Sequence, residues 1–332
     1  MKANLYALGT TILVTGALYA ASDATHRRAL SRPQVQVAVA EGMGTVHFDS
    51  ATGQYRVSVL TPGGRSNFAY EPRTNVELTV EAVVAHDADT DTYSYEYTLQ
   101  NARTSRQRVG DFSIAYDGDL TDVSVPEGWW RVPSFGRKVV AWACKDCAHV
   151  GIAPGAKTSG YRIRSSARGT TGPSPTSEEK SAGTSRGAHF LPGVVRCTAA
   201  GDAPVPSIPK LEWLEEGVLR LPTPDEDVVS GRTVGPVNVP NSLTASERIQ
   251  RIQEYVRISA EEKWIADDEV AASYAAALRR VEAGLSEPSG GDLKRGISKL
   301  AKLADNDLAD GKITSEAHAL VKHNVQHLLL DK

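Results

Sequence analysis

Hydrophobic and polar residues alternate without interruption from Thr92 to Leu99. Side chains on a β-strand point alternately to its two faces, so Tyr93, Tyr95 and Tyr97 share a face with Leu99. This pattern predicts a half-buried strand of an antiparallel sheet. A row of exposed tyrosines would offer a stacking surface for sugars or peptides. The leucine in the same register instead favours a tyrosine face that packs into a core.

Similar short apolar runs recur between residues 33 and 165, separated by turns rich in Gly, Pro and Asp. The other runs are Gln34–Val39, Thr45–Phe48, Tyr55–Leu60, Val76–Val84, Val109–Tyr116, Lys138–Trp142 and Ser159–Arg164. Their spacing indicates a sandwich or barrel, and we favour an antiparallel β-sandwich of roughly seven to nine strands over residues 33–200. The low-complexity composition of residues 169–187 predicts a disordered surface loop. His189–Cys197 then predicts a late strand that rejoins the sheet.

The pattern changes after residue 200. Residues 201–240 are rich in Pro and punctuated by Gly, which predicts an extended linker. Over residues 241–332 apolar residues recur at helical spacing, beginning after the capping box Thr244-Ala-Ser-Glu247. Four such stripes with short connections predict an all-α four-helix bundle. The stripes contain Ile249, Ile252 and Val256; Val270, Tyr274, Leu278 and Val281; Leu293, Ile297 and Leu300; and Ala317, Leu320, Val321 and Leu328.

Two helix starts within this half repeat one pattern. Lys263–Glu269 and Gly311–Glu316 each place an isoleucine, Ile265 or Ile313, just before a polar cap and a helix. The repeat indicates either a duplicated helical hairpin or the same helix-start chemistry used twice.

The N-terminus has the pattern of an export signal. Lys2 precedes an apolar run from Leu5 to Ala21, and small residues follow, so we expect a signal peptide over residues 1–24. The run is short for a membrane span, which needs ~20 apolar residues. An uncleaved anchor, helped by the positive cluster His26-Arg27-Arg28, is the alternative and the only expected membrane contact. The expected location is therefore secreted or in the cell envelope.

The 332-residue chain carries a net charge of −3 and has no basic stripe, so we expect no nucleic-acid partner. It contains no Gly-rich phosphate loop, Gly-x-Ser-x-Gly elbow or kinase motif. We therefore expect no cofactor and no catalytic residue.

The three cysteines are Cys144, Cys147 and Cys197, and export permits a disulfide among them. The C-x-x-C pair follows an apolar strand rather than opening a helix in a βαβ unit, which disfavours thioredoxin-like redox chemistry. A Cys3His zinc site would need His149 or His189 as its fourth ligand. We favour a structural disulfide, either Cys144–Cys147 or one of these with Cys197.

Trp129 and Trp130 are the candidate binding residues. They follow the turn Pro126-Glu-Gly128, and neighbouring residues on a strand point oppositely, so one indole can be buried while the other is exposed. An exposed indole would stack on a ligand better than the tyrosine row does. The alternative is a loop tryptophan that covers the end of the sandwich.

Other candidate metal sites are weak. His323 and His327 are four residues apart on one helix face but lack the glutamate of the zincin motif. Asn306–Ile313 resembles a calcium loop, but Leu308 and Ala317 would occupy positions that require oxygen ligands. We expect no metal.

The helical half resembles the FIVAR-like segments at the ends of secreted bacterial proteins, in which a Trp-Ile or Gly-Lys-Ile sequence opens a helix. The matching stretches are Ile249–Ile265 and Leu308–Leu328, preceded by the connector Gly231–Pro236. The first half is similar to exported immunoglobulin-like β-sandwich modules through Tyr93–Asn101, Gly128-Trp129 with Trp142, and Ile152–Gly155 with Ser159-Gly-Tyr161. The resemblance covers most of residues 75–332 and implies architecture and export, but no catalytic residue. The Cys144–Cys147 insertion and the loop at 169–187 lie outside its pattern.

Together these patterns predict a non-enzymatic exported surface or envelope protein with a binding or structural role. A cell-wall or other extracellular polymer is the expected partner, as the resemblance implies. One alternative is a carbohydrate-binding or adhesion module that uses Trp129, Trp130 and the loops at one end of the sandwich. Another is a hydrolase or redox enzyme whose site the sequence does not reveal.

Overall fold

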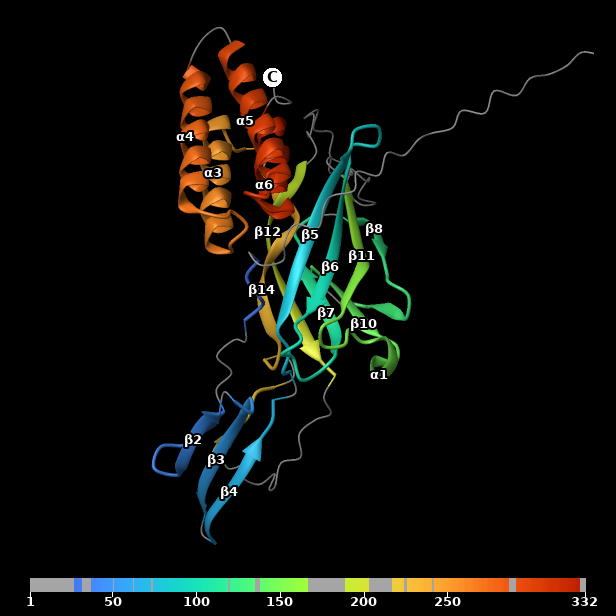
Figure 1. Ribbon diagram of the computed structural model, residues 1–332, viewed down its shortest axis with the longest axis vertical. Coiled ribbons are helices and arrows are strands. Elements are labelled where there is room, and N and C mark those ends of the chain that lie inside the picture. The colour runs from blue at the N-terminus through green and yellow to red at the C-terminus, as the bar shows by residue number, and fades with distance from the viewer. Residues whose placement is uncertain are drawn as a thin grey trace, which may run out of the picture.

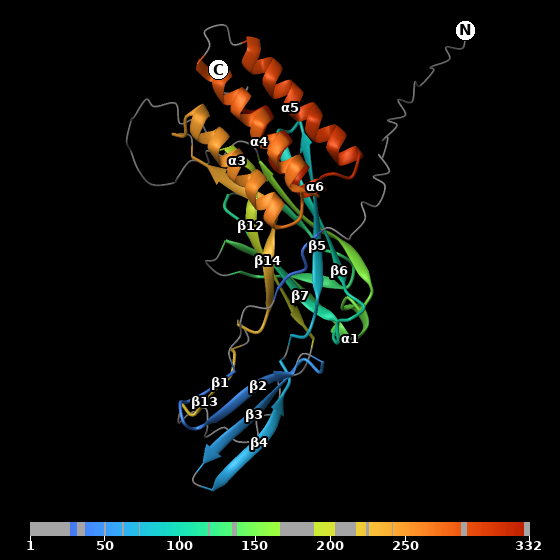
Figure 2. The same ribbon diagram turned by 60° about the vertical axis from the view of Figure 1, so that its left-hand side comes forward.

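The structure of the protein is a computed structural model. It describes residues 27–31, 37–49, 51–61, 63–72, 74–118, 120–134, 138–166, 189–202, 217–223, 226–240, 242–286 and 291–328. The expected signal peptide and the expected loop at 169–187 lie outside these residues. Within them, two larger β-sheets lie between a group of helices at one end and a small β-sheet at the other (Figures 1 and 2). The coarse prediction of antiparallel β-structure followed by C-terminal helices is confirmed.

The largest sheet has five antiparallel strands. Their order is β14 (Val229–Val239), β12 (His189–Gly201), β7 (Val109–Ala115), β10 (Val139–Cys144) and β9 (Trp129–Val132). The late strand predicted at His189–Cys197 is therefore present as β12.

The second sheet has four antiparallel strands. Their order is β5 (Leu78–Asp87), β6 (Thr92–Asn101), β11 (Lys157–Ser166) and β8 (Leu120–Ser124). Strand β6 is the alternating segment, and Tyr93, Tyr95, Tyr97 and Leu99 are all buried. The tyrosine face is therefore core, and its alternative role as a binding platform is wrong.

Aromatic side chains from both sheets form the core between them. The Tyr97 ring of β6 lies 6.2 Å from Phe112 of β7, and its hydroxyl donates a 2.9 Å hydrogen bond to the Val234 carbonyl of β14. Tyr161 of β11 lies edge-on to Trp142 of β10 at 5.7 Å. These contacts bury the inner faces of the two sheets against each other.

A small β-unit has a core of its own. Three strands, β2 (Gly44–Asp49), β3 (Gln54–Thr61) and β4 (Gly64–Tyr70), pair in order, while β1 (Ala38–Val39) pairs with β13 (Leu219–Arg220). Its buried residues are Val37, Val57, Val59, Tyr70 and Leu219, a cluster distinct from the main core. Residues 33–200 therefore do not form one continuous β-unit, because the first strands pack apart from the rest.

The predicted linker over residues 201–240 is wrong for its last part. Val229–Val239 form strand β14, which pairs with β12 over eleven residue pairs, from Ala199 opposite Val229 to His189 opposite Val239. Pro236 lies opposite Pro192 within this ladder. Proline removes a backbone donor, and β14 tolerates it because it is an edge strand of its sheet.

The four predicted helices are present. They are α3 (Ala245–Glu261), α4 (Asp268–Ala283), α5 (Gly291–Ala309) and α6 (Ser315–His327), with a short 3-10 turn, η1 (Gly284–Ser286), after α4. The Thr244–Glu247 capping box has both of its hydrogen bonds. No helix in the described part of the chain is long and apolar enough to cross a membrane.

The two repeated helix starts meet in space. Ile265 and Ile313 form an isolated antiparallel β-bridge, and both are buried. The Ala266 N–H donates to the Lys312 carbonyl at 2.9 Å, and the Thr314 N–H donates to the Trp264 carbonyl at 2.8 Å. The repeat therefore joins the α3–α4 connection to the α5–α6 connection.

Helix α6 attaches the helices to the sheets. The buried Glu316 carboxylate accepts a 2.7 Å hydrogen bond from the Ala82 N–H of β5 and forms an ion pair with Arg27. The Asn324 amide donates to the Pro192 carbonyl of β12 at 2.9 Å. The helix thus satisfies backbone groups of both larger sheets, which would otherwise be buried without partners.

Candidate functional site

The outer face of the five-stranded sheet has unusually small side chains. Its inward residues, such as Phe112, Val140 and Trp142, are buried in the core. The residues that alternate with them point outward. Apart from the charged Asp111 and Arg196, these outward residues have short side chains. The outward residues are Asp111, Ser113 and Ala115 on β7; Val139, Ala141 and Ala143 on β10; and Arg196, Thr198 and Ala200 on β12.

Strand register arranges these residues in rows across the sheet. One row runs from β9 to β12 through Trp130, Ala143, Asp111 and Ala200. The next row runs from β9 to β14 through Val132, Ala141, Ser113, Thr198 and Ser230. Larger groups stand at the margins, while Ala, Ser and Thr form the floor.

This arrangement produces a hollow, which we call the sheet hollow. Its volume is about 820 Å³, and its lining includes Asp111, Ser113, Ala141, Thr198, Val132 and Arg196. That volume lies within the range of ligand pockets, ~300–1,000 Å³. A second depression of about 670 Å³, bordered by Arg28, Arg232, Glu261 and Glu262, also includes Arg196. Arg196 therefore stands where the two depressions adjoin.

The two candidate tryptophans have different environments. Trp129 is 3% exposed and lies edge-on to Tyr161, 5.1 Å between ring centres, so it belongs to the core. Trp130 is 44% exposed. It pairs with Ala143 on the outer face and lies two residues before Val132, which lines the sheet hollow. Trp130 is therefore a surface residue and Trp129 a core residue, so the two tryptophans do not form one binding site.

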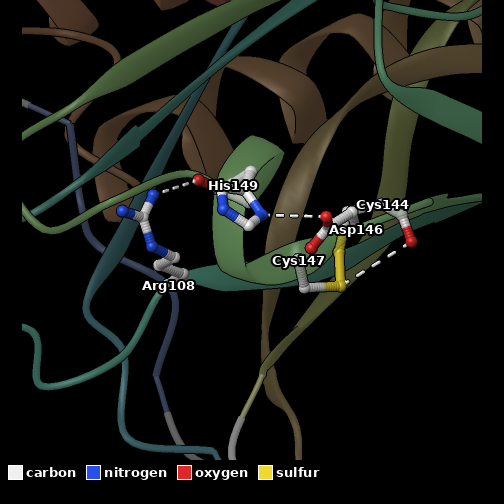
Figure 3. The surroundings of a disulfide bond; sticks show 6 residues. Arg108, Cys144, Asp146, Cys147 and His149 are labelled. Carbon is white, nitrogen blue, oxygen red and sulfur yellow. Dashed lines mark hydrogen bonds and ion pairs between the residues drawn. A yellow bond between two sulfur atoms is a disulfide. The ribbon is translucent and has the colours of Figure 1, made fainter.

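The cysteines form one disulfide, between Cys144 and Cys147 (Figure 3). It joins the end of β10 to the short helix α1 (Cys147–Val150), where the Asp146 carboxylate lies 2.8 Å from the His149 ring nitrogen. Cys197 is not disulfide-bonded, is buried in β12, and lies opposite Ile114, two strands from β10. Burial raises the pKa of its thiol to about 12.

This arrangement decides between the cysteine alternatives. The Cys144–Cys147 disulfide is the pairing present, and a pairing with Cys197 is wrong. Strand β7 lies between Cys197 on β12 and Cys144 on β10. The Cys197 thiol therefore cannot share one metal ion with the sulfurs of Cys144 and Cys147. In the described ranges, no group of three or more His, Cys, Asp or Glu residues is arranged to hold a metal.

The His323 side chain of α6 lies in the interface with β5 and β6, whereas His327 lies near Leu191 of β12 and Val239 of β14. The His323 ring is edge-on to Tyr93 at 5.5 Å and lies 6.3 Å from His318 and 6.4 Å from His86. Burial first, and then the neighbouring groups His318, Lys322 and His86, lower the pKa of His323 to about 4. The ring is therefore neutral at pH 7 and packs as part of the interface.

The calcium-like segment has structural partners. The Asp307 carboxylate accepts a 2.9 Å hydrogen bond from the buried Tyr274 hydroxyl and lies 3.4 Å from the Lys312 ammonium. Its oxygens thus connect α5 to α4 and to the following turn.

Comparison with known proteins adds no family assignment. No protein-family model matches the chain, and no curated protein matches it. The choice of a candidate site therefore rests on the structure alone, and the best-defined site is the sheet hollow. Sequence reasoning missed it, although the signal was present in the small residues at every second position of β7, β10 and β12.

Proposed function

We propose that this protein is a non-enzymatic exported protein that binds an extracellular glycan polymer on the outer face of its five-stranded sheet. The two larger sheets would act as an immunoglobulin-like β-sandwich, and the helices as a FIVAR-like four-helix bundle that contacts the cell envelope. The resemblance of the sequence to exported modules supports the location.

The observation that carries the proposal is the exposed indole of Trp130 beside the sheet hollow. An indole presents a flat apolar face, on which the C–H face of a sugar ring can stack. The low floor of Ala141, Ser113 and Ala115 leaves space for the rest of the chain. The hydroxyls of Ser113 and Thr198, which hydrogen-bond to each other, are available to sugar hydroxyls.

Binding fits the charged groups better than hydrolysis does. Asp111 is the only carboxylate among the described residues that line the sheet hollow. Most glycoside hydrolases use two carboxyl groups across the scissile bond, ~5–9.5 Å apart. The described lining therefore offers no acid–base pair, and we favour a binding role.

The test is affinity electrophoresis against a panel of neutral and acidic polysaccharides, followed by calorimetry on the best one. Trp130→Ala should weaken binding about 10-fold, the loss expected for one stacking contact. Phe48→Ala is the matched control, because Phe48 is 42% exposed but lies on the separate small sheet. Equal losses in the two variants, or no binding to any polysaccharide, would refute the proposal. Release of new reducing ends would instead support the enzyme alternative.

A further inference from the structure

We infer that the bound glycan is an acidic polymer that carries carboxylate groups, and that Arg196 holds one of them. This inference rests on the proposed function. It names the substrate class and the residue that selects it.

Arg196 is exposed in the middle of the outer sheet face, and no hydrogen-bond or ion-pair partner is found for it among the described residues. The neighbouring arginines differ in this respect. Arg232 lies 3.6 Å from both Glu261 and Glu262, and Arg27 is buried against Glu316. A guanidinium presents paired donors that match a carboxylate in geometry and charge. Arg196 is thus the cation at the sheet hollow that is available to an anionic ligand.

The distance from Trp130 sets the size of the ligand. The row that contains Trp130 ends at Ala200 on β12, and Arg196 is four residues away along that strand. Three strand gaps and four residue rises place the two positions about 20 Å apart, measured diagonally across the sheet. A ligand that contacts both must therefore be an extended chain of several rings rather than a monosaccharide.

The probes are hyaluronan oligosaccharides, whose acidic rings carry carboxylates, and the same oligosaccharides after chemical reduction of their carboxyl groups. At low ionic strength the wild-type protein should bind hyaluronan about 10-fold more tightly than its reduced form, the effect expected of one charge-assisted contact.

Three variants separate this inference from the proposed function. Arg196→Gln should remove the preference for the carboxylate form over the reduced form, whereas Arg196→Lys should keep part of that preference. Trp130→Ala should weaken binding of both polymers. Arg131→Gln is the matched control, since Arg131 is also exposed but points to the opposite face of β9.

If Arg196→Gln binds both polymers as the wild type does, the inference is overturned. Loss with Trp130→Ala would then still support glycan binding. An equal affinity of the wild-type protein for the two forms, or binding of neither form, also overturns the inference. If neither form binds and no other polysaccharide binds, the proposed function and the inference fail together.

Discussion

The buried His323 should make the attachment of the helices to the sheets sensitive to acid. The ring is 8% exposed, and its Nε2 atom has no hydrogen-bond partner in the described part of the chain. Protonation would place a charge there beside Lys322 and near His318 and His86, while the Asp305 carboxylate of α5 already contacts His318 and Lys322. Release of that charge to water requires α6 to move away from Tyr93 and β5.

The size of the effect follows from the two pKa values. The pKa of His323 is about 4 in the folded protein and about 6.5 when exposed. Above the exposed value both states are neutral, and pH has no effect through this group. As pH falls below it, the unfolded state binds a proton that the folded state does not, so stability is lost. The loss is about 2 kcal/mol at about pH 5 and reaches about 3 kcal/mol below the folded pKa.

The assay is urea unfolding followed by the helical circular-dichroism signal, at neutral pH and at about pH 5. Wild type should lose about 2 kcal/mol more between these conditions than His323→Gln does. His47→Gln, at an exposed position on β2, should retain the wild-type pH dependence. The lowered pKa of His318, caused mainly by burial, acts in the same direction in all three proteins. Equal pH dependence in wild type and His323→Gln would refute this reasoning.

Two further predictions concern the ion pair and the disulfide. Glu316→Gln should destabilise the protein by about 3 kcal/mol in urea unfolding, because the side chain of Arg27, 3% exposed, would keep a buried charge with only the partly exposed Glu81, 3.5 Å away, as its counter-ion. Glu96→Gln, in an exposed ion pair, should cost less than about 1 kcal/mol, and a similar cost for both variants would contradict the argument. Reduction of Cys144–Cys147 should cost only about 2 kcal/mol, because the loop that it closes is short. Loss of all folded structure on reduction, seen by circular dichroism, would show a larger role for this bond.

Local patterns predicted the elements that carry strong periodicity. The alternation around Tyr95 identified β6 and its buried face, because every second side chain had to enter a core. The capping box at Thr244 located the start of α3, since its side chain and backbone bonds are formed within four residues. The paired isoleucines Ile265 and Ile313 also indicated a relation between two loops, and the structure places them opposite each other.

Other features depended on contacts between distant segments. Strand β14 contains two glycines and Pro236, so its composition resembles a linker, and only its ladder with β12 stabilises it as a strand. The small β-unit is closed by β13, which returns to β1 from far along the chain. The sheet hollow was missed for a related reason, because outward positions on β7, β10 and β12 become one surface only after the strands pair.

Helix α6 follows all the strands in the order of synthesis, although β5 depends on it. Strand β5 is an edge strand, and its Ala82 N–H is satisfied by Glu316 of α6. During translation the strands emerge from the ribosome first. The Leu30 N–H can then bind the Leu78 carbonyl of β5, but the edge around Ala82 stays uncovered until α6 has been made. An uncovered edge can pair with another chain. We therefore expect self-association of newly made chains to begin at β5, and timely arrival of α6 to prevent it.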